Sequence, residues 1–176
     1  MSEPKTPSTN ADQTLSATGN VYEDFTAGQV FPHALGRTVT TTDNAWFTQL
    51  TLNTNPIHFD HAYAAQTEWG KPLVNSTFIM ALVTGLSVDD LSKNAVNLGW
   101  DSVRLPAPVF EGDTIYAQST VLECRESKSR PHQGIVRFET IGFNQDGTVV
   151  ISYQRTALVY RRGHVPVRPR PEPKPR

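Results

Sequence analysis

TFIMALVTGLSV, residues 77–88, is the stretch that decides the fold of this chain. Its apolar side chains recur at three- and four-residue spacings, which indicates a helix. The positions between them are also mostly apolar, so this helix is expected to be buried on nearly all sides. It is the most hydrophobic helix in the sequence, and the rest of the chain should therefore pack around it.

After Asn94 the pattern changes from helix to strand. Four segments have a strand-like composition: residues 96–104, 114–125, 134–144 and 149–161. The turn signals at 111–113 (EGD) and 145–147 (QDG) separate them, and the second one predicts a hairpin. These strands predict a long antiparallel meander, and the helix at 77–88 is the natural cover for its apolar face.

Upstream of the central helix, the sequence predicts one strand and two shorter helices. The strand covers residues 30–40, and the first helix runs from the capping oxygens of residues 41–43 to about Leu52. That helix places Trp46, Phe47 and Leu50 on one face. Asp60 should cap the second helix, which Gly70 should close. The order predicts an α+β chain of hot-dog type, an antiparallel sheet wrapped around a central apolar helix.

The two ends differ in composition from the rest of the 176-residue chain. Residues 1–20 are rich in Ser, Thr, Asn and Pro, and residues 163–176 alternate Pro with charge, so both segments are expected to be disordered. One folded domain is then expected at 21–162. The net charge of −1 gives no basis for a nucleic-acid partner. Without a long apolar run or signal core, no membrane partner and a cytoplasmic location are expected.

His58 is the first candidate for chemistry, in the segment NTNPIHFD at residues 53–60. It follows a proline-stiffened loop, and histidine can exchange protons near neutral pH. A lone histidine is more often a surface or structural residue. Asn53 and Asn55 raise the odds, because their polar groups can orient an imidazole ring or a water molecule.

A second candidate feature is the polar pair Asn75-Ser76 at the start of the central helix. Backbone amides at a helix N-terminus are free to bind negative charge, and the helix dipole favours it. Such amides could hold the oxygen of an enolate formed from a thioester. The alternative interpretation is an ordinary helix cap.

The residues 53–78, NTNPIHFDHAYAAQTEWGKPLVNSTF, and the later run 103–115, VRLPAPVFEGDTI, resemble the MaoC-like dehydratase family, which includes the (R)-specific enoyl-CoA hydratases. LNTNPIHFD, PLVNSTF, GLSVDDL and RESKSRPHQGIV are most similar to the branch acting on mesaconyl-CoA or itaconyl-CoA. The resemblance implies a hot-dog homodimer or higher homo-oligomer, and an acyl-CoA or acyl-carrier thioester as substrate. It also implies that His58 is catalytic and that amides at Ser76 and Thr77 hold the thioester oxygen. It implies no metal and no cofactor beyond the coenzyme A or carrier pantetheine of the substrate.

Two positions depart from the family pattern. Asn53 stands where relatives place a catalytic aspartate, and asparagine cannot act as a general base. The acid–base work would then fall on His58, with Asn53 orienting water or substrate. Asn75-Ser76 stands where many relatives have His-Gly, which keeps the backbone amide but adds a side chain to the pocket.

Arg125, Lys128 and Arg130 form a basic group with two open interpretations. Their cations could hold CoA phosphates or a substrate carboxylate, because arginine binds such groups well. They could equally be a solvated turn between two strands.

The sequence therefore predicts a hydro-lyase that reversibly hydrates a 2-enoyl thioester or dehydrates a 3-hydroxyacyl thioester. A branched dicarboxylic acyl group is one candidate substrate, and a carrier-bound acyl group of a specialised biosynthetic route is another. Two alternatives remain open. One is a non-catalytic hot-dog subunit that binds acyl thioesters, and the other is a thioesterase.

Overall fold

A computed structural model describes residues 19–167, 171 and 173–174 of the chain. The segments predicted to be disordered, 1–20 and 163–176, lie largely outside these residues, so the predicted domain limits stay predictions. The helical elements are η1 (Tyr22–Asp24), α1 (Thr41–Leu50), η2 (Pro56–His58), α2 (His61–Ala64), α3 (Ser76–Leu86) and the π-helical turn η3 (Val88–Ser92). The strands are β1 (Val30–Pro32), β2 (Arg37–Thr38), β3 (Ala95–Arg104), β4 (Thr114–Glu126), β5 (Gln133–Phe143) and β6 (Val149–Tyr160).

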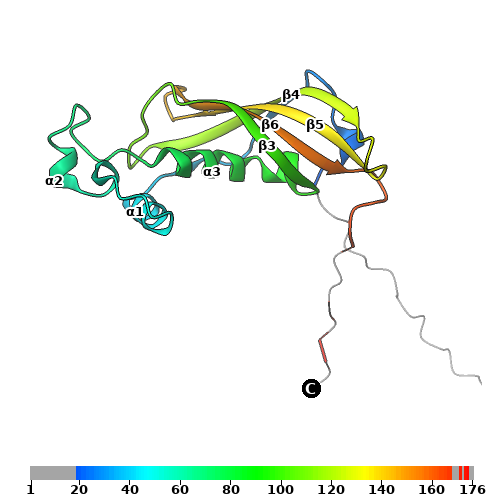
Figure 1. Ribbon diagram of the computed structural model, residues 1–176, viewed down its shortest axis with the longest axis horizontal. Helices are drawn as coiled ribbons and strands as arrows, with labels where there is room; N and C mark the ends of the chain where they lie inside the picture. The colour runs from blue at the N-terminus through cyan, green and yellow to red at the C-terminus, as the bar shows by residue number, and fades with distance from the viewer. Residues whose placement is uncertain (1–18, 168–170, 172, 175–176) are drawn as a thin grey trace, which may run out of the picture.

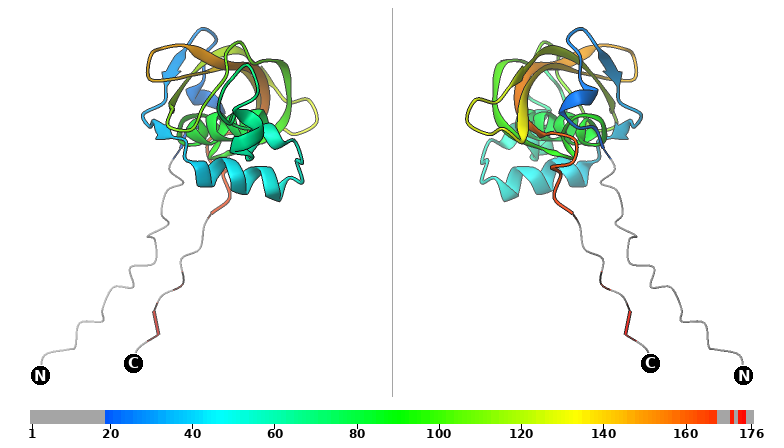
Figure 2. Two further views of the ribbon diagram at one scale, coloured as in Figure 1. Left: turned by 90° about the vertical axis from the view of Figure 1, so that its left-hand side faces the viewer. Right: turned by 90° about the vertical axis from the view of Figure 1, so that its right-hand side faces the viewer.

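The strands form one antiparallel sheet that curves around α3 (Figures 1 and 2). This is the predicted α+β hot-dog arrangement. The four long strands agree with the predicted ranges to within one residue at each end. Burial alternates along β5, where Val136 and Phe138 are fully buried and Arg137 and Glu139 between and after them are not.

The order of the strands differs from a simple meander. β4, β5 and β6 are neighbours in sequence and in space, but β3 pairs with β6 at the far edge, giving the order β1-β4-β5-β6-β3. The loop of residues 105–113 carries the chain across the sheet. Pro106 and Pro108 in this loop lack the amide hydrogens of a strand, so β3 and β4 are not joined as a hairpin.

The strand predicted at 30–40 is broken into β1 and β2, which both pair with β4. Pro32 lies where its missing amide hydrogen costs no bond to β4, since the next amide, that of His33, still donates to the Ala117 carbonyl at 3.0 Å. His33 turns its side chain inward, and its ring joins a buried polar row. Its Nδ1 lies 2.6 Å from Oδ2 of Asp90, and its Nε2 lies 2.9 Å from Oγ of Ser119. Ser119 Oγ lies in turn 2.8 Å from Oγ1 of Thr140 on β5.

The central helix is covered on one side only within this chain. Ile79 and Val83 of α3 are buried against the sheet. Gly142 on β5 makes this close packing possible, since a Cβ there would meet a methyl of Val83 at 2.5 Å. The opposite face of α3, which includes Ala81 and Gly85, is exposed. The prediction that α3 is buried on nearly all sides is therefore wrong for the single chain.

Helix α1 has its polar side turned inward. Its N-cap is Thr40, one residue before the predicted capping group, and Asp43 completes a capping box with it. Asn44 and Thr48 are buried, while Trp46 is 68% exposed. Together with α2, this helix lies at the end of the molecule where α3 begins (Figure 1). α2 is shorter than predicted, although Asp60 caps it and Gly70 closes the following turn with a positive φ.

Candidate active site

His58 lies at the end of η2, in a loop that its neighbours hold in a fixed shape. Asn55 is the N-cap of η2, and its Oδ1 accepts a hydrogen bond from the amide of Ile57 at 3.2 Å. The Nδ1 of His58 lies 3.0 Å from the carbonyl oxygen of Leu73. A carbonyl only accepts, so Nδ1 carries the proton in the neutral ring and Nε2 carries the lone pair. Nε2 bonds to no group among the described residues, and it is free to accept a proton.

The start of α3 supplies the second polar group. Asn75 is the N-cap, as the sequence predicts, and its Oδ1 accepts hydrogen bonds from the amide of Thr77 at 3.0 Å and from its hydroxyl at 2.7 Å. The Thr77 amide is therefore occupied, which argues against its predicted role in holding the substrate. The Ser76 amide bonds to no group among the described residues, so it is available to an anion.

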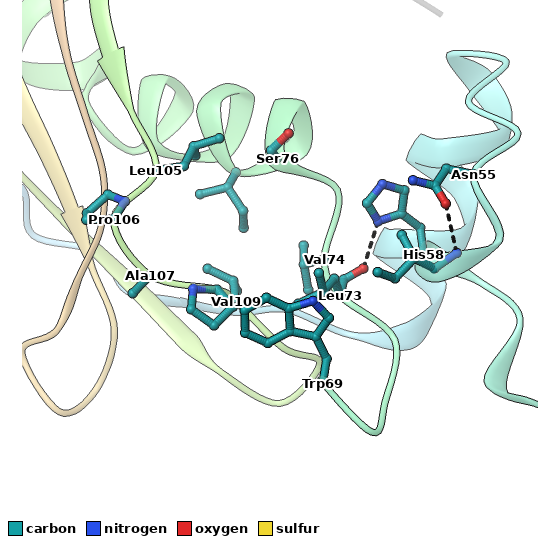
Figure 3. Close-up of a pocket in the computed structure, with 13 residues that line it drawn as sticks. Asn55, His58, Trp69, Leu73, Val74, Ser76, Leu105, Pro106, Ala107 and Val109 are labelled. Carbon is teal, nitrogen blue, oxygen red and sulfur yellow. Dashed lines mark hydrogen bonds between the residues drawn. The ribbon is translucent and has the colours of Figure 1, made fainter. Parts of the chain in front are cut away.

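His58 and Ser76 line the same cavity, which has a volume of about 400 Å³. Figure 3 shows His58 and Asn55 on one side, Ser76 above, and the loop from Leu105 to Ala107 on the opposite side. The remaining wall is apolar. Its side chains are Ile57, Trp69, Leu73, Val74, Ile79, Leu105, Pro106, Ala107, Pro108 and Val109. A concave, mostly apolar wall with few polar groups is typical of a small-molecule site.

Asn53 does not line this cavity. Its Oδ1 accepts a hydrogen bond from the amide of Asn55 at 3.0 Å, which closes a turn just before η2. Asn75 is almost fully buried and lies behind the cavity wall. Both asparagines thus support the backbone around His58 and Ser76.

The sequence analysis missed the buried contribution of α1. Asn44 bonds to the backbone on both sides of the cavity, and Thr48 lies beside it. The apolar residues of α1 drew attention to the opposite face. The available signal was the four-residue spacing of Asn44 and Thr48, which places two polar side chains on one side of the helix.

Residues 2–168 match the family described as Mesaconyl-CoA hydratase. The chain belongs to the mesaconyl-CoA hydratase family. Relatives in sequence include the beta-methylmalyl-CoA dehydratase of Chloroflexus aurantiacus, 34% identical over 88% of this chain and 43% of that protein. The mesaconyl-CoA hydratase of Cereibacter sphaeroides is also 34% identical, over 87% of this chain and 45% of that protein. The chain thus spans less than half the length of these curated relatives.

Solved structures agree with this family assignment. A putative MaoC domain protein dehydratase from Chloroflexus aurantiacus superposes with a TM-score of 0.79 at 31% identity, over 91% of this chain and 46% of that one. A Mycobacterium tuberculosis protein described as having a double hotdog fold superposes with a TM-score of 0.76 at 21% identity, over 83% of this chain and 46% of that one. The second likeness concerns the fold alone.

In this member of the mesaconyl-CoA hydratase family, the predicted basic group lies far from His58. Arg125 is near the end of β4, and Lys128 and Arg130 follow in the turn before β5. β4 has 13 residues and so spans about 40 Å. Its first residues lie at the end of the molecule that carries α1 and α2, and the turn after it lies at the other end (Figure 1). Within one chain, these cations lie at the end of the molecule away from α1 and α2, the two helices between which His58 is placed.

In the part of the chain that the structure describes, no group of three or more His, Cys, Asp or Glu side chains is arranged to hold a metal ion. No helix there has the length and hydrophobicity to cross a membrane.

Proposed function

We propose that this chain is a hydratase that reversibly adds water to a 2-enoyl thioester to form a 3-hydroxyacyl thioester. The observation that carries the proposal is one cavity lined by two complementary groups. One is His58, whose Nε2 is free to accept a proton, and the other is Ser76 at the open N-terminus of α3. Membership of the mesaconyl-CoA hydratase family supports the same reaction.

In the hydration direction, Nε2 of His58 takes one proton from a water molecule as the water oxygen bonds to the β-carbon. The electron pair of the double bond shifts toward the α-carbon, and negative charge develops on the thioester oxygen. The Ser76 amide and the positive end of the α3 dipole stabilise that charge. The α-carbon then receives a proton from the imidazolium of His58, which restores the neutral ring. Dehydration follows the same steps in reverse.

The finer substrate assignment is also a proposal. The names of the relatives, mesaconyl-CoA hydratase and beta-methylmalyl-CoA dehydratase, support a branched dicarboxylic acyl group on coenzyme A. Itaconyl-CoA is a substrate of the same kind, and a carrier-bound acyl group of a biosynthetic route remains open. The predicted cytoplasmic location stays a prediction.

A non-catalytic thioester-binding subunit is the second candidate, because Asn53 replaces the expected aspartate and bonds to the loop backbone. It predicts binding of acyl-CoA without a change of mass by one water. A thioesterase has less support, because no Asp or Glu is among the residues that line the cavity to activate water for hydrolysis.

We further propose that two copies of the chain associate through α3 and β3. β3 forms one edge of the sheet, and its Val96, Leu98 and Trp100 are exposed. Long apolar edge strands tend to pair with another chain. Beside β3 is a groove of about 450 Å³ lined by Thr77, Met80, Ala81, Thr84, Gly85, Val88, Asn97 and Trp100. Since Thr77 adjoins Ser76, this pairing would place the active site next to the interface.

The reaction is tested by mass spectrometry of enoyl- and hydroxyacyl-CoA thioesters after incubation with the protein. We expect a gain or loss of one water with a crotonyl-, mesaconyl- or itaconyl-type thioester, and no such change with His58→Ala. General acid–base catalysis by a positioned histidine contributes about 10²- to 10⁴-fold to a reaction rate.

The matched control is His61→Ala, because His61 is an exposed residue of α2 that does not line the cavity. It should keep the wild-type rate. Wild-type turnover by a folded His58→Ala variant would refute the proposal, and release of free thiol would indicate a thioesterase.

A further inference from the structure

The side chain of Asn44 is fully buried and bonds to three backbone groups in two segments, at His58 and at residues 73–75. Its Nδ2 donates to the carbonyl oxygen of His58 at 2.7 Å and to that of Leu73 at 3.0 Å. Its Oδ1 accepts a hydrogen bond from the amide of Asn75 at 2.9 Å. One carboxamide thus uses both donor hydrogens and its acceptor on backbone groups around the cavity.

Each of these backbone groups belongs to a residue that sets the geometry of the site. The first is the carbonyl of His58 itself. The second, the carbonyl of Leu73, is also the acceptor that orients the His58 ring through Nδ1. The third is the amide of Asn75, the residue directly before Ser76 and the cap of α3. Asn44 therefore bonds to the segment that carries the base and to the segment that carries the anion-binding amide.

Thr48, one helical turn after Asn44, supports the same arrangement from the same side of α1. Its Oγ1 accepts a hydrogen bond from Nδ2 of Asn75 at 3.3 Å. The two segments are also joined directly, since the Leu73 amide donates to the Ile57 carbonyl at 3.1 Å. Because α1 is a regular helix, its two polar side chains provide a rigid support for both.

We propose that Asn44 is a positioning residue that sets the distance and orientation between Nε2 of His58 and the Ser76 amide. This inference rests on the proposed hydration reaction, since it assigns Asn44 a role in that reaction. Displacement of reacting groups by about 1 Å can reduce a rate by roughly a hundredfold. Loss of the three hydrogen bonds weakens the hold of α1 on both segments, and we expect a displacement of this order between them.

The experiment compares kcat and KM of wild type, Asn44→Ala and Asn44→Asp with a thioester that the wild type hydrates. For Asn44→Ala we expect kcat to fall by about tenfold to a hundredfold, with KM changed less than about threefold. Asn44→Asp keeps the acceptor for the Asn75 amide but loses both donors to the His58 and Leu73 carbonyls. It should lose kcat as well, which assigns the effect to the base side of the cavity.

Asn94→Ala is the matched control for simple loss of a buried asparagine. Asn94 is also buried and also donates to two backbone carbonyls, those of Gly19 and Asn20, which are far from His58 in sequence. It should lower the melting temperature about as much as Asn44→Ala and leave kcat per folded molecule unchanged. Equal kcat losses in the two variants, or none in a folded Asn44→Ala, would overturn the inference.

A second readout does not depend on turnover. The Nδ1 proton of His58 should give a proton NMR resonance in the wild type, and that resonance should shift or broaden in Asn44→Ala but not in Asn94→Ala. If the wild type hydrates no thioester, the proposed function fails while this measurement still tests Asn44. An unchanged His58 resonance in Asn44→Ala would reject the positioning role.

Discussion

At the scale of single residues, the polar groups of the site divide into those that face the cavity and those that hold them. His58, Asn55 and Ser76 line the cavity. Asn53 and Asn75 lie behind it and bond to the backbone. Two of the residues predicted to act on substrate are thus placed to shape the loop and the helix start instead. This division explains how a chain with asparagine in place of aspartate keeps an ordered site.

Asn53 provides a direct test of this division. In Asn53→Asp a carboxylate oxygen can accept the same hydrogen bond from the Asn55 amide, so the turn should be kept. Asn53→Ala removes the acceptor, which should cost about 1 kcal/mol of folding free energy and loosen the segment before His58. We expect Asn53→Asp to keep the wild-type melting temperature and Asn53→Ala to lower it, both followed by thermal unfolding. Equal stability of the two variants would contradict a supporting role for the side chain.

The sequence could predict His58 and the helix start at Asn75 because both depend on local signals. A proline-stiffened loop and a polar pair before an apolar helix can be recognised without the fold. The hydrogen bond from Nδ1 of His58 to Leu73 could not be predicted, because it joins residues 15 apart through a tertiary contact. The same holds for Asn44, whose backbone partners lie 14 to 31 residues away in the sequence.

At the scale of elements, α1 shows how a helical pattern can mislead. The apolar face with Trp46 and Leu50 is exposed, and the polar face with Asn44 and Thr48 packs against the site. Hydrophobic periodicity identifies a helix correctly, but it cannot tell which face the rest of the protein covers. Here the inner face must satisfy backbone groups of two irregular segments, so polar side chains are required there.

The N-terminus of α1 gives a prediction about pH. Asp43 accepts hydrogen bonds from the Thr40 amide at 2.8 Å and from Nη2 of Arg37 at 2.8 Å. The Arg37 guanidinium and the Thr40 donors hold the pKa of the Asp43 carboxyl well below its usual range. A lowered folded-state pKa means that the carboxylate stabilises the fold above its ordinary pKa near 4, and that this stabilisation is lost as pH falls below it.

Asp43→Asn should therefore reduce the free energy of unfolding by about 1 kcal/mol at pH 7, as expected for a lost helix cap and a partly exposed ion pair. The difference from wild type should shrink as the pH is lowered below about 4. Urea unfolding at several pH values measures both. A difference that grows toward acid pH would contradict the assignment.

At the scale of the whole molecule, the strands were predictable but their order was not. Strand-like composition marks the four long strands, with turn residues at 111–113 and 145–147, and these are properties of short stretches. The placement of β3 beside β6 depends on the path of the loop at 105–113. The hydrophobic periodicity of the sequence does not indicate that path. That path matters for the site, since it brings Leu105 and Ala107 to the cavity wall opposite His58 (Figure 3).

The exposed edge of β3 leads to a prediction of assembly. We expect a solution mass of twice 19.5 kDa or a higher multiple, measured by sedimentation or light scattering. Trp100→Glu should shift the mass toward a single chain, because it places a charge among apolar groups at the proposed contact. Leu122→Glu is the control, since Leu122 has a similar exposure but lies on β4 away from this edge. A wild-type protein that sediments as a single chain would contradict the proposed pairing.

The hydrogen bonds in the row from Asp90 through His33 and Ser119 to Thr140 all run in one direction. The carboxylate can only accept, so His33 turns its Nδ1 proton toward Asp90, and the neutral ring must accept the Ser119 proton at Nε2. Ser119 has then given its only proton and must accept one from Thr140. Both hydroxyls in the row therefore point toward the ring. The carboxylate at one end of the row thus sets the orientation of the Ser119 and Thr140 dipoles at the other, inside the sheet.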